Sequence, residues 1–166
     1  MVFRFSRKLA KKIKLDLLDL DETVPLSENP FLDWTAHLFT ADRTQYIIVT
    51  NTFSLLSIIF NGRGITGDSE FITQTLSMMR QYMHGESFEL IFERIIVPNI
   101  KQIFLSKSSN RRVTGSMNTL IETAKYVLTY DNISPYEAAR RINGLPMSYL
   151  EHATPEDAFP RLKLKS

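Results

Sequence analysis

The sequence predicts an α+β fold in which a mostly antiparallel sheet of about four to five strands packs with four to five helices. Two observations carry this prediction. Runs rich in Ile, Val and aromatic residues follow one another across short polar turns, and amphipathic segments with capping residues lie on both sides of them. Because 43% of the 166 residues are hydrophobic, we expect one domain over residues 1–166, with a basic C-terminal tail at about 151–166.

The expected strands differ in how clearly the sequence marks them. Val2–Ser6 alternates, with Phe3 and Phe5 on one face, and predicts a short first strand. The clearest runs are Trp34–Thr40, Gln45–Thr50 and Leu55–Phe60. Their short connections, one of them the turn at residues 41–43, favour an antiparallel meander. We expect the segment Ile100–Lys107 to return to the sheet.

Each expected helix has a recognisable start or stop. Ser6 caps a helix to about Leu15 that buries Leu9 and Ile13. The other expected helices are Asp68 to about Met83 (with Asp68 as the cap and Gly85 after the end), Phe88–Val97 before Pro98, a stripe from Met117 to the Asp131-Asn132 stop, and Ser134 to Asn143-Gly144.

Composition limits the possible functions. The chain has no cysteine, which excludes disulfides, thiol catalysis and cysteine-ligated zinc and is in keeping with a cytoplasmic protein. We expect no metal or cofactor, because His37, His84 and His152 lack zinc-site spacing. We also expect no membrane segment, since the longest apolar run, Leu55–Phe60, is far too short to span a bilayer.

The most informative segment is Ser109–Asn118, where two arginines, a glycine and a serine stand before an amphipathic helical stripe. We interpret it as a polar turn that can bind an anion, because helix N–H groups and arginine forks both attract phosphate. The candidate ligand-binding residues are Lys107, Asn110, Arg111, Arg112, Ser116 and Asn118. In the competing structural interpretation, Gly115 permits a tight turn, Ser116 caps the helix and an arginine pairs with a distant carboxylate.

Several sequence blocks occur in an order that resembles an uncharacterised bacterial family, a domain of unknown function. The blocks are the strand and Lys-containing helix at Phe3–Lys12, the Asn29–Trp34 run with Ala36, Asn51, Lys107, the Asn-Arg-Arg-Val-Thr-Gly-Ser-Met-Asn run at Asn110–Asn118, and the Arg140–Met147 block. This chain has Thr35 where the family pattern has histidine, so any role of that histidine is lost or moved here. The resemblance implies a shared fold and no particular activity.

Other residue groups have weaker functional interpretations. Arg4, Arg7, Lys8, Lys11, Lys12 and Lys14 could follow a nucleic-acid backbone with Phe3, Phe5 and Tyr46 as stacking platforms, although we favour a solvated helix face. Asp19, Asp21 and Glu22 could hold a hard cation but are more typical of a solvated connection. Ser116 lacks the surroundings of a nucleophile elbow.

Three classes of function follow, and the sequence leaves all three open. Our preferred hypothesis is a non-catalytic binding module that contacts nucleic acid or a phosphorylated small molecule through Arg111 and Arg112. The second is a small nuclease or toxin-like RNA-modifying enzyme whose site assembles only on folding. The third is an accessory domain that binds a protein partner through an edge strand or an apolar patch.

Overall fold

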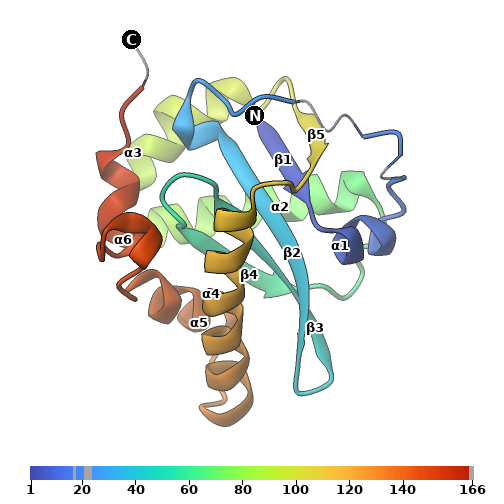
Figure 1. Ribbon diagram of the computed structural model, residues 1–166, viewed down its shortest axis with the longest axis vertical. Coiled ribbons are helices and arrows are strands. Elements are labelled where there is room, and N and C mark those ends of the chain that lie inside the picture. The colour runs from blue at the N-terminus through green and yellow to red at the C-terminus, as the bar shows by residue number, and fades with distance from the viewer. Residues whose placement is uncertain (17, 21–23, 165–166) are drawn as a thin grey trace.

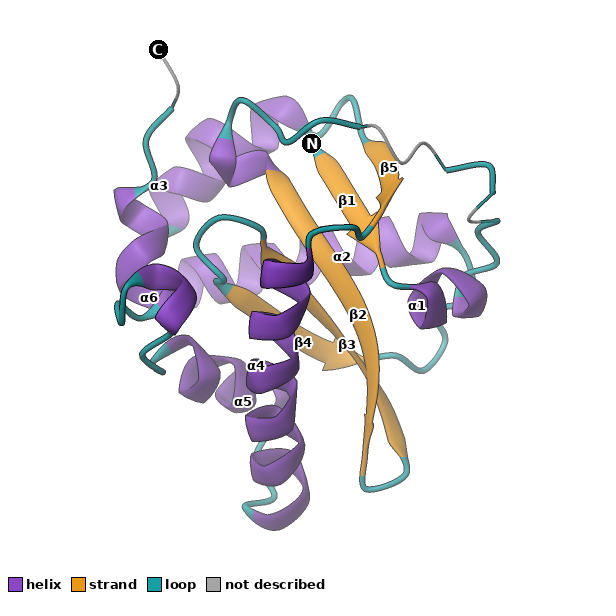
Figure 2. Cartoon of the chain, viewed as in Figure 1, coloured by secondary structure: helices purple, strands orange, loops and turns teal. Residues whose placement is uncertain are grey.

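The computed structural model describes residues 1–16, 18–20 and 24–164, and shows one five-stranded sheet with α4 on one face and α2 on the other (Figures 1 and 2). The strands are β1 (Val2–Phe5), β2 (Asp33–Ala41), β3 (Thr44–Asn51), β4 (Ser57–Asn61) and β5 (Phe104–Lys107). The α-helices are α1 (Arg7–Lys12), α2 (Asp68–Gly85), α3 (Glu89–Ile91), α4 (Arg111–Tyr130), α5 (Pro135–Asn143) and α6 (Pro155–Ala158).

The sheet order is β4-β3-β2-β1-β5, and the α+β prediction is confirmed. The strands β2, β3 and β4 form the predicted antiparallel meander, with eight and five residue pairs in its two ladders. The strand β1 lies between β2 and β5 and is parallel to both, with four pairs on each side. The sheet is therefore mixed but mostly antiparallel.

Local backbone geometry explains where β3 and β4 begin. Asp42 and Arg43 both have positive φ, 44° and 63°, as the two-residue hairpin turn between β2 and β3 requires. The strand β4 begins at Ser57 rather than at the predicted Leu55, because Leu55 has a φ of 62° and belongs to the preceding turn. The Asn51 side chain stabilises that turn by accepting from the backbone N–H groups of residues 53 and 54.

Two helix boundaries differ from the prediction. The helix α1 starts after the predicted Ser6 cap but ends at Lys12, since Lys14 adopts a φ of 58° that cannot continue a helix. The helix α2 has Gly67 at its N-cap, and Asp68 is its first residue rather than the cap. The predicted helix before Pro98 exists as α3 followed by a π-helical segment (Phe92–Ile96) and a 3-10 turn (Val97–Asn99).

Residues from both ends of the chain build the core. Trp34 and Phe159 are fully buried with ring centroids 6.0 Å apart, and Phe31 packs edge-on against Phe159 at 5.3 Å. Much of the segment that we describe as a basic tail thus folds back, as α6 and the 3-10 turn Phe159–Arg161. Asp21 and Glu22, which we considered with Asp19 for a cation, lie outside the described residues. Lys165 of the basic tail also lies outside them.

None of the helices in the described ranges combines the length and apolar character that crossing a bilayer requires.

Candidate anion-binding site

The Arg-Arg segment is helical from its first arginine, so the predicted turn is wrong. Asn110 caps α4, and its Oδ1 accepts from the backbone N–H groups of Arg112 at 3.1 Å and Val113 at 3.2 Å. Asn and Ser both cap helices well, and the cap forms at Asn110 rather than at Ser116, six residues later. Because Asn110 occupies two first-turn N–H groups, ligand recognition here depends on side chains more than on the backbone.

Arg111 and Arg112 border a cavity of about 700 Å³ between α4 and the loop that follows α5. We call this cavity the arginine pocket. Its lining residues are Arg111, Arg112, Gly115, Ser116, Thr119, Pro146, Met147, Ser148, Tyr149 and His152. No carboxylate is among them, so the pocket offers donors and positive charge to a ligand without a competing acid.

Tyr149 holds one of the two guanidinium groups in place. The Arg112 guanidinium carbon lies 5.3 Å from the centre of the Tyr149 ring, a cation–π distance. The Tyr149 hydroxyl donates to the Thr52 carbonyl at 3.2 Å, which ties the ring to the turn before β4. Burial raises the pKa of Tyr149, so the phenol stays neutral at physiological pH.

Neither arginine has an ion-pair partner within residues 1–16, 18–20 and 24–164. The distant carboxylate of the structural interpretation is therefore not found in the described ranges. Moreover, two cations at a helix N-terminus face the positive end of the helix dipole, and α4 has no acidic residue in its first turn. Their placement does nothing for the stability of α4.

Gly115 is a second locally unfavourable choice on the same helix face. It lies in the fifth position of α4, where glycine costs roughly 0.5–1 kcal/mol relative to alanine. A Cβ at this position would meet no atom within 4 Å, so no packing reason requires glycine. The predicted role of Gly115 in a tight turn is wrong, because the residue is helical.

Ser116 is an unpromising nucleophile in this geometry. Its Oγ donates to the Arg112 carbonyl one turn earlier in the helix, at 3.0 Å. His152 borders the same pocket, but no hydrogen bond joins it to Ser116 in the described part of the chain. A serine activated by histidine needs that hydrogen bond, at least as a loose contact.

The remaining predicted residues lie apart from the pocket. Asn110 is the helix cap, and Lys107 ends β5 beside Phe5 of β1. Asn118 projects from the neighbouring face of α4 into a second hollow of about 960 Å³ between α1, β2 and α4. The structure thus brings Arg111, Arg112 and Ser116 together and separates them from the other three.

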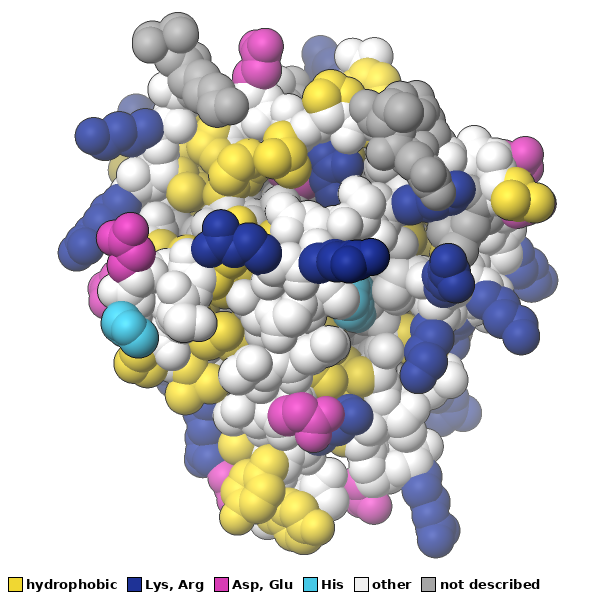
Figure 3. Space-filling view, in the orientation of Figure 1, with side chains coloured by type: hydrophobic (Ala, Val, Ile, Leu, Met, Phe, Trp, Pro, Cys, Tyr) yellow, Lys and Arg dark blue, Asp and Glu magenta, His cyan; other side chains and the backbone are white. Residues whose placement is uncertain are grey.

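We call the second hollow the basic groove. Its cationic lining residues are Arg7, Lys8, Lys11, Lys12 and Lys125. The lining includes one acid, Glu122, which pairs with Lys125 at 3.3 Å. In Figure 3, Lys and Arg side chains form a band across this face, from α4 at its centre to α1.

Some residues that we considered for nucleic-acid binding serve the fold instead. Phe3 and Phe5 are buried in the core and cannot stack on bases. Arg4 is 5% exposed and forms an ion pair with Asp33 at 2.8 Å, so it is not part of the basic face.

His37 lies beneath the basic groove and carries no charge. It is 8% exposed, and its Nε2 has no hydrogen-bond partner among the residues that the structure describes. Burial lowers its pKa to about 4 from an ordinary value of 6.5, so the imidazole is neutral at pH 7.

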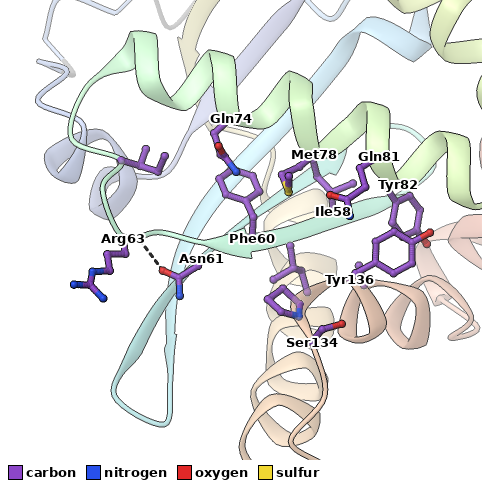
Figure 4. A pocket seen from close by; sticks show the side chains of 14 residues that line it. Ile58, Phe60, Asn61, Arg63, Gln74, Met78, Gln81, Tyr82, Ser134 and Tyr136 are labelled. Carbon is purple, nitrogen blue, oxygen red and sulfur yellow. Dashed lines mark hydrogen bonds between the residues drawn. The ribbon is translucent and has the colours of Figure 1, made fainter.

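A third hollow, of about 480 Å³, is mostly apolar and lies between the edge strand β4, α2 and α5 (Figure 4). Phe60, Met78 and Tyr136 are among its lining residues. The Asn143 amide braces the start of β4 by bonding both the N–H and the carbonyl of Ser57 at 2.8 Å. This hollow is the region that a protein-binding function would use.

Sequence reasoning missed Tyr149 and His152, which enter the pocket from a loop more than thirty residues away. The only signal near them is the Arg140–Met147 block, which ends just before the loop.

Fold and surface together define a small α+β domain with a basic, hollowed face. The chain belongs to a family described as a domain of unknown function, DUF6933, which matches residues 2–158. Among curated proteins, none matches the sequence significantly.

Proposed function

We propose that the protein is a non-catalytic binding module whose arginine pocket holds a phosphate group of a nucleic acid or a phosphorylated small molecule. One observation carries this proposal: Arg111 and Arg112 stand side by side at an acid-free cavity, with no ion-pair partner in the described ranges. Guanidinium groups in such a setting match the oxygens of a phosphate in both charge and geometry.

Local instability on α4 supports the same proposal. Cations at the N-terminal end of a helix and a glycine within it both cost stability, and here they share one pocket. Places where a sequence breaks local rules without a packing reason are expected to be functional sites.

We favour binding over catalysis because of how the polar side chains around the arginines are used. The Ser116 hydroxyl bonds to its own helix, and the Tyr149 hydroxyl bonds to the backbone of Thr52. His152 also borders the pocket, but the lining holds no carboxylate or second histidine to complete the acid–base pair that a nuclease or RNA-modifying enzyme uses.

The direct test is an NMR titration that observes the arginine Nε–H signals. Inorganic phosphate and uridine 5′-monophosphate are added to wild-type protein at low salt. We expect the signals of Arg111 and Arg112 to shift in a saturable manner, while those of Arg140 and Arg141 stay in place. If no arginine signal on α4 moves with either probe, the proposed function is wrong.

A further inference from the structure

We propose that the ligand is a single-stranded nucleic acid that runs from the arginine pocket, over α4 at Gly115, into the basic groove. This inference rests on the proposed function, because the arginine pocket is its first contact.

The two hollows open on adjoining faces of one helix. On α4, the pocket is lined by Arg111, Arg112, Gly115, Ser116 and Thr119, and the groove by Asn118, Ile121, Glu122 and Lys125. Arg111 lies seven residues before Asn118 and therefore on the same side of the helix, which places Arg111 at the border between the two hollows. Gly115 and Asn118 differ by about 5 Å along the helix axis. A strand leaving the pocket thus enters the groove within one turn of α4.

Gly115 lies on α4 between Arg112, which lines the pocket, and Asn118, which lines the groove. It is exposed and has open space where a Cβ would stand. A glycine at such a position lets another backbone approach the helix closely. Most other side chains would raise a barrier between the pocket and the groove.

Charge complementarity identifies the occupant as a polyanion. Besides Lys125, which is paired with the one acid of the groove, the groove adds four cations to the two arginines: Arg7, Lys8, Lys11 and Lys12. A mononucleotide would fill the pocket and leave these cations without a ligand, whereas consecutive phosphates of a strand would neutralise both regions.

A single strand fits the two hollows on either side of α4 better than a duplex does. The strand must follow two recesses on either side of a helix, which a flexible chain can do and a stiff duplex cannot. One face of the Arg112 guanidinium lies on Tyr149, and the opposite face of a guanidinium plane is a known platform for an unstacked base.

The test is fluorescence anisotropy with labelled oligouridylates of 3, 6 and 12 nucleotides, the matching thymidylates, a 12-base-pair duplex and a 12-residue polyglutamate. We expect affinity to rise with strand length and the single strands to bind at least tenfold more tightly than the duplex or the peptide. The thymidylates differ from the uridylates by the 2′-hydroxyl and the C5 methyl group, so equal binding shows that neither group contributes.

Two variants separate this inference from the proposed function. Lys8→Ala/Lys11→Ala should weaken the 12-mer at least fivefold more than it weakens uridine monophosphate. It should also reduce the slope of log K against log salt by about 1.4, or 0.7 for each lost phosphate contact. Gly115→Ala should weaken the 12-mer at least fivefold more than it weakens uridine monophosphate, because Gly115 also lines the pocket. The same variant should raise the midpoint of thermal unfolding, so misfolding cannot explain the loss.

The outcomes are distinct. If the 12-mer binds no more tightly than the mononucleotide, or if both variants bind it like wild type, the strand path is wrong and the phosphate pocket stands. Equal binding of polyglutamate and the 12-mer would also overturn the inference. A wild type that binds neither the mononucleotide nor any oligonucleotide contradicts both proposals.

Discussion

The helices α4 and α5 each carry two consecutive arginines, and the two pairs have opposite surroundings. Arg140 and Arg141 lie in the last turn of α5, where cations complement the helix dipole. Arg140 Nε pairs with Glu86 at 2.9 Å, and Arg141 pairs with Asp131. Attraction to Glu86, then to Glu137, raises the pKa of Arg140 above its ordinary value.

Arg111 and Arg112 show the reverse at every point. They lie at the start of α4, against the dipole, and no described carboxylate pairs with them. The helices α4 and α5 pack against each other, so both pairs belong to one part of the fold. The pair on α5 serves the structure, and the contrast supports our proposal that the pair on α4 binds a ligand.

The largest expected effect on stability concerns Arg4, which has more hydrogen-bond partners than the arginines of α5. Arg4 donates to both oxygens of Asp33 and to the carbonyls of Val24 and Pro25, and both members of the pair are buried. Asp33→Ala would leave a buried cation without its counter-charge, so we expect a loss of about 3–5 kcal/mol in the free energy of unfolding. Urea denaturation of the variant and the wild type measures this difference in the free energy of unfolding.

The control for this prediction removes both charges. Arg4→Met/Asp33→Leu should recover part of the lost stability, because it removes the unpaired charge. The recovery is partial because the Val24 and Pro25 carbonyls and the Thr52 hydroxyl lose their hydrogen bonds to the pair. A loss below about 1 kcal/mol for Asp33→Ala would show that even a fully bonded arginine contributes little here.

The next effect is the pH dependence of stability that His37 causes. It sets the pH range in which the stabilities of the arginine variants can be compared. His37 has a pKa of about 4 in the folded protein and about 6.5 when unfolded. The unfolded state therefore binds the proton first as the pH falls. The contribution of neutral His37 to the free energy of unfolding is fully present above pH 6.5. It declines between pH 6.5 and 4, by about 3 kcal/mol in total.

His37→Leu isolates this contribution, because the carboxylates titrate alike in both proteins. Between pH 7 and 4, the variant should lose about 3 kcal/mol less than wild type in urea denaturation. Identical pH profiles would mean that His37 does not resist protonation in the folded state.

The smallest effect concerns how Arg112 is held. Tyr149→Leu removes the ring beneath the guanidinium, a contact worth about 0.5–1 kcal/mol. We expect uridine monophosphate to bind roughly two- to fivefold more weakly, measured by the same NMR titration. Tyr126→Leu, at an exposed tyrosine farther along α4, is the matched control and should bind like wild type.

How much the sequence predicts depends on how local each feature is. The meander follows from alternation and short turns within thirty residues, and the residues marking its hairpin are adjacent in the chain. The position of β1 between β2 and β5 depends on pairing across up to a hundred residues, which no local pattern encodes.

The same limit applies to the site. The Arg-Arg motif predicts the two arginines and Ser116, because they are consecutive in one block. Asn110 and Ser116 are both good capping residues, and periodicity cannot decide between them. Because the cap is Asn110, the residues that we predicted as a turn form the first turns of α4. Tyr149 reaches the pocket through the packing of the loop after α5 against α4 and against the turn before β4.

The most direct test of the central claim measures two quantities on two double variants. Arg111→Ala/Arg112→Ala should weaken uridine monophosphate at least tenfold, because each lost hydrogen bond to a charged group is worth about 1.5–3 kcal/mol. Its midpoint of thermal unfolding should stay close to that of wild type, because removing two cations from the helix N-terminus offsets the lost Arg112–Tyr149 contact. Arg140→Ala/Arg141→Ala should lower the midpoint and leave binding unchanged. If the α4 variant unfolds at a lower temperature and binds like wild type, its arginines serve the fold and the claim is wrong.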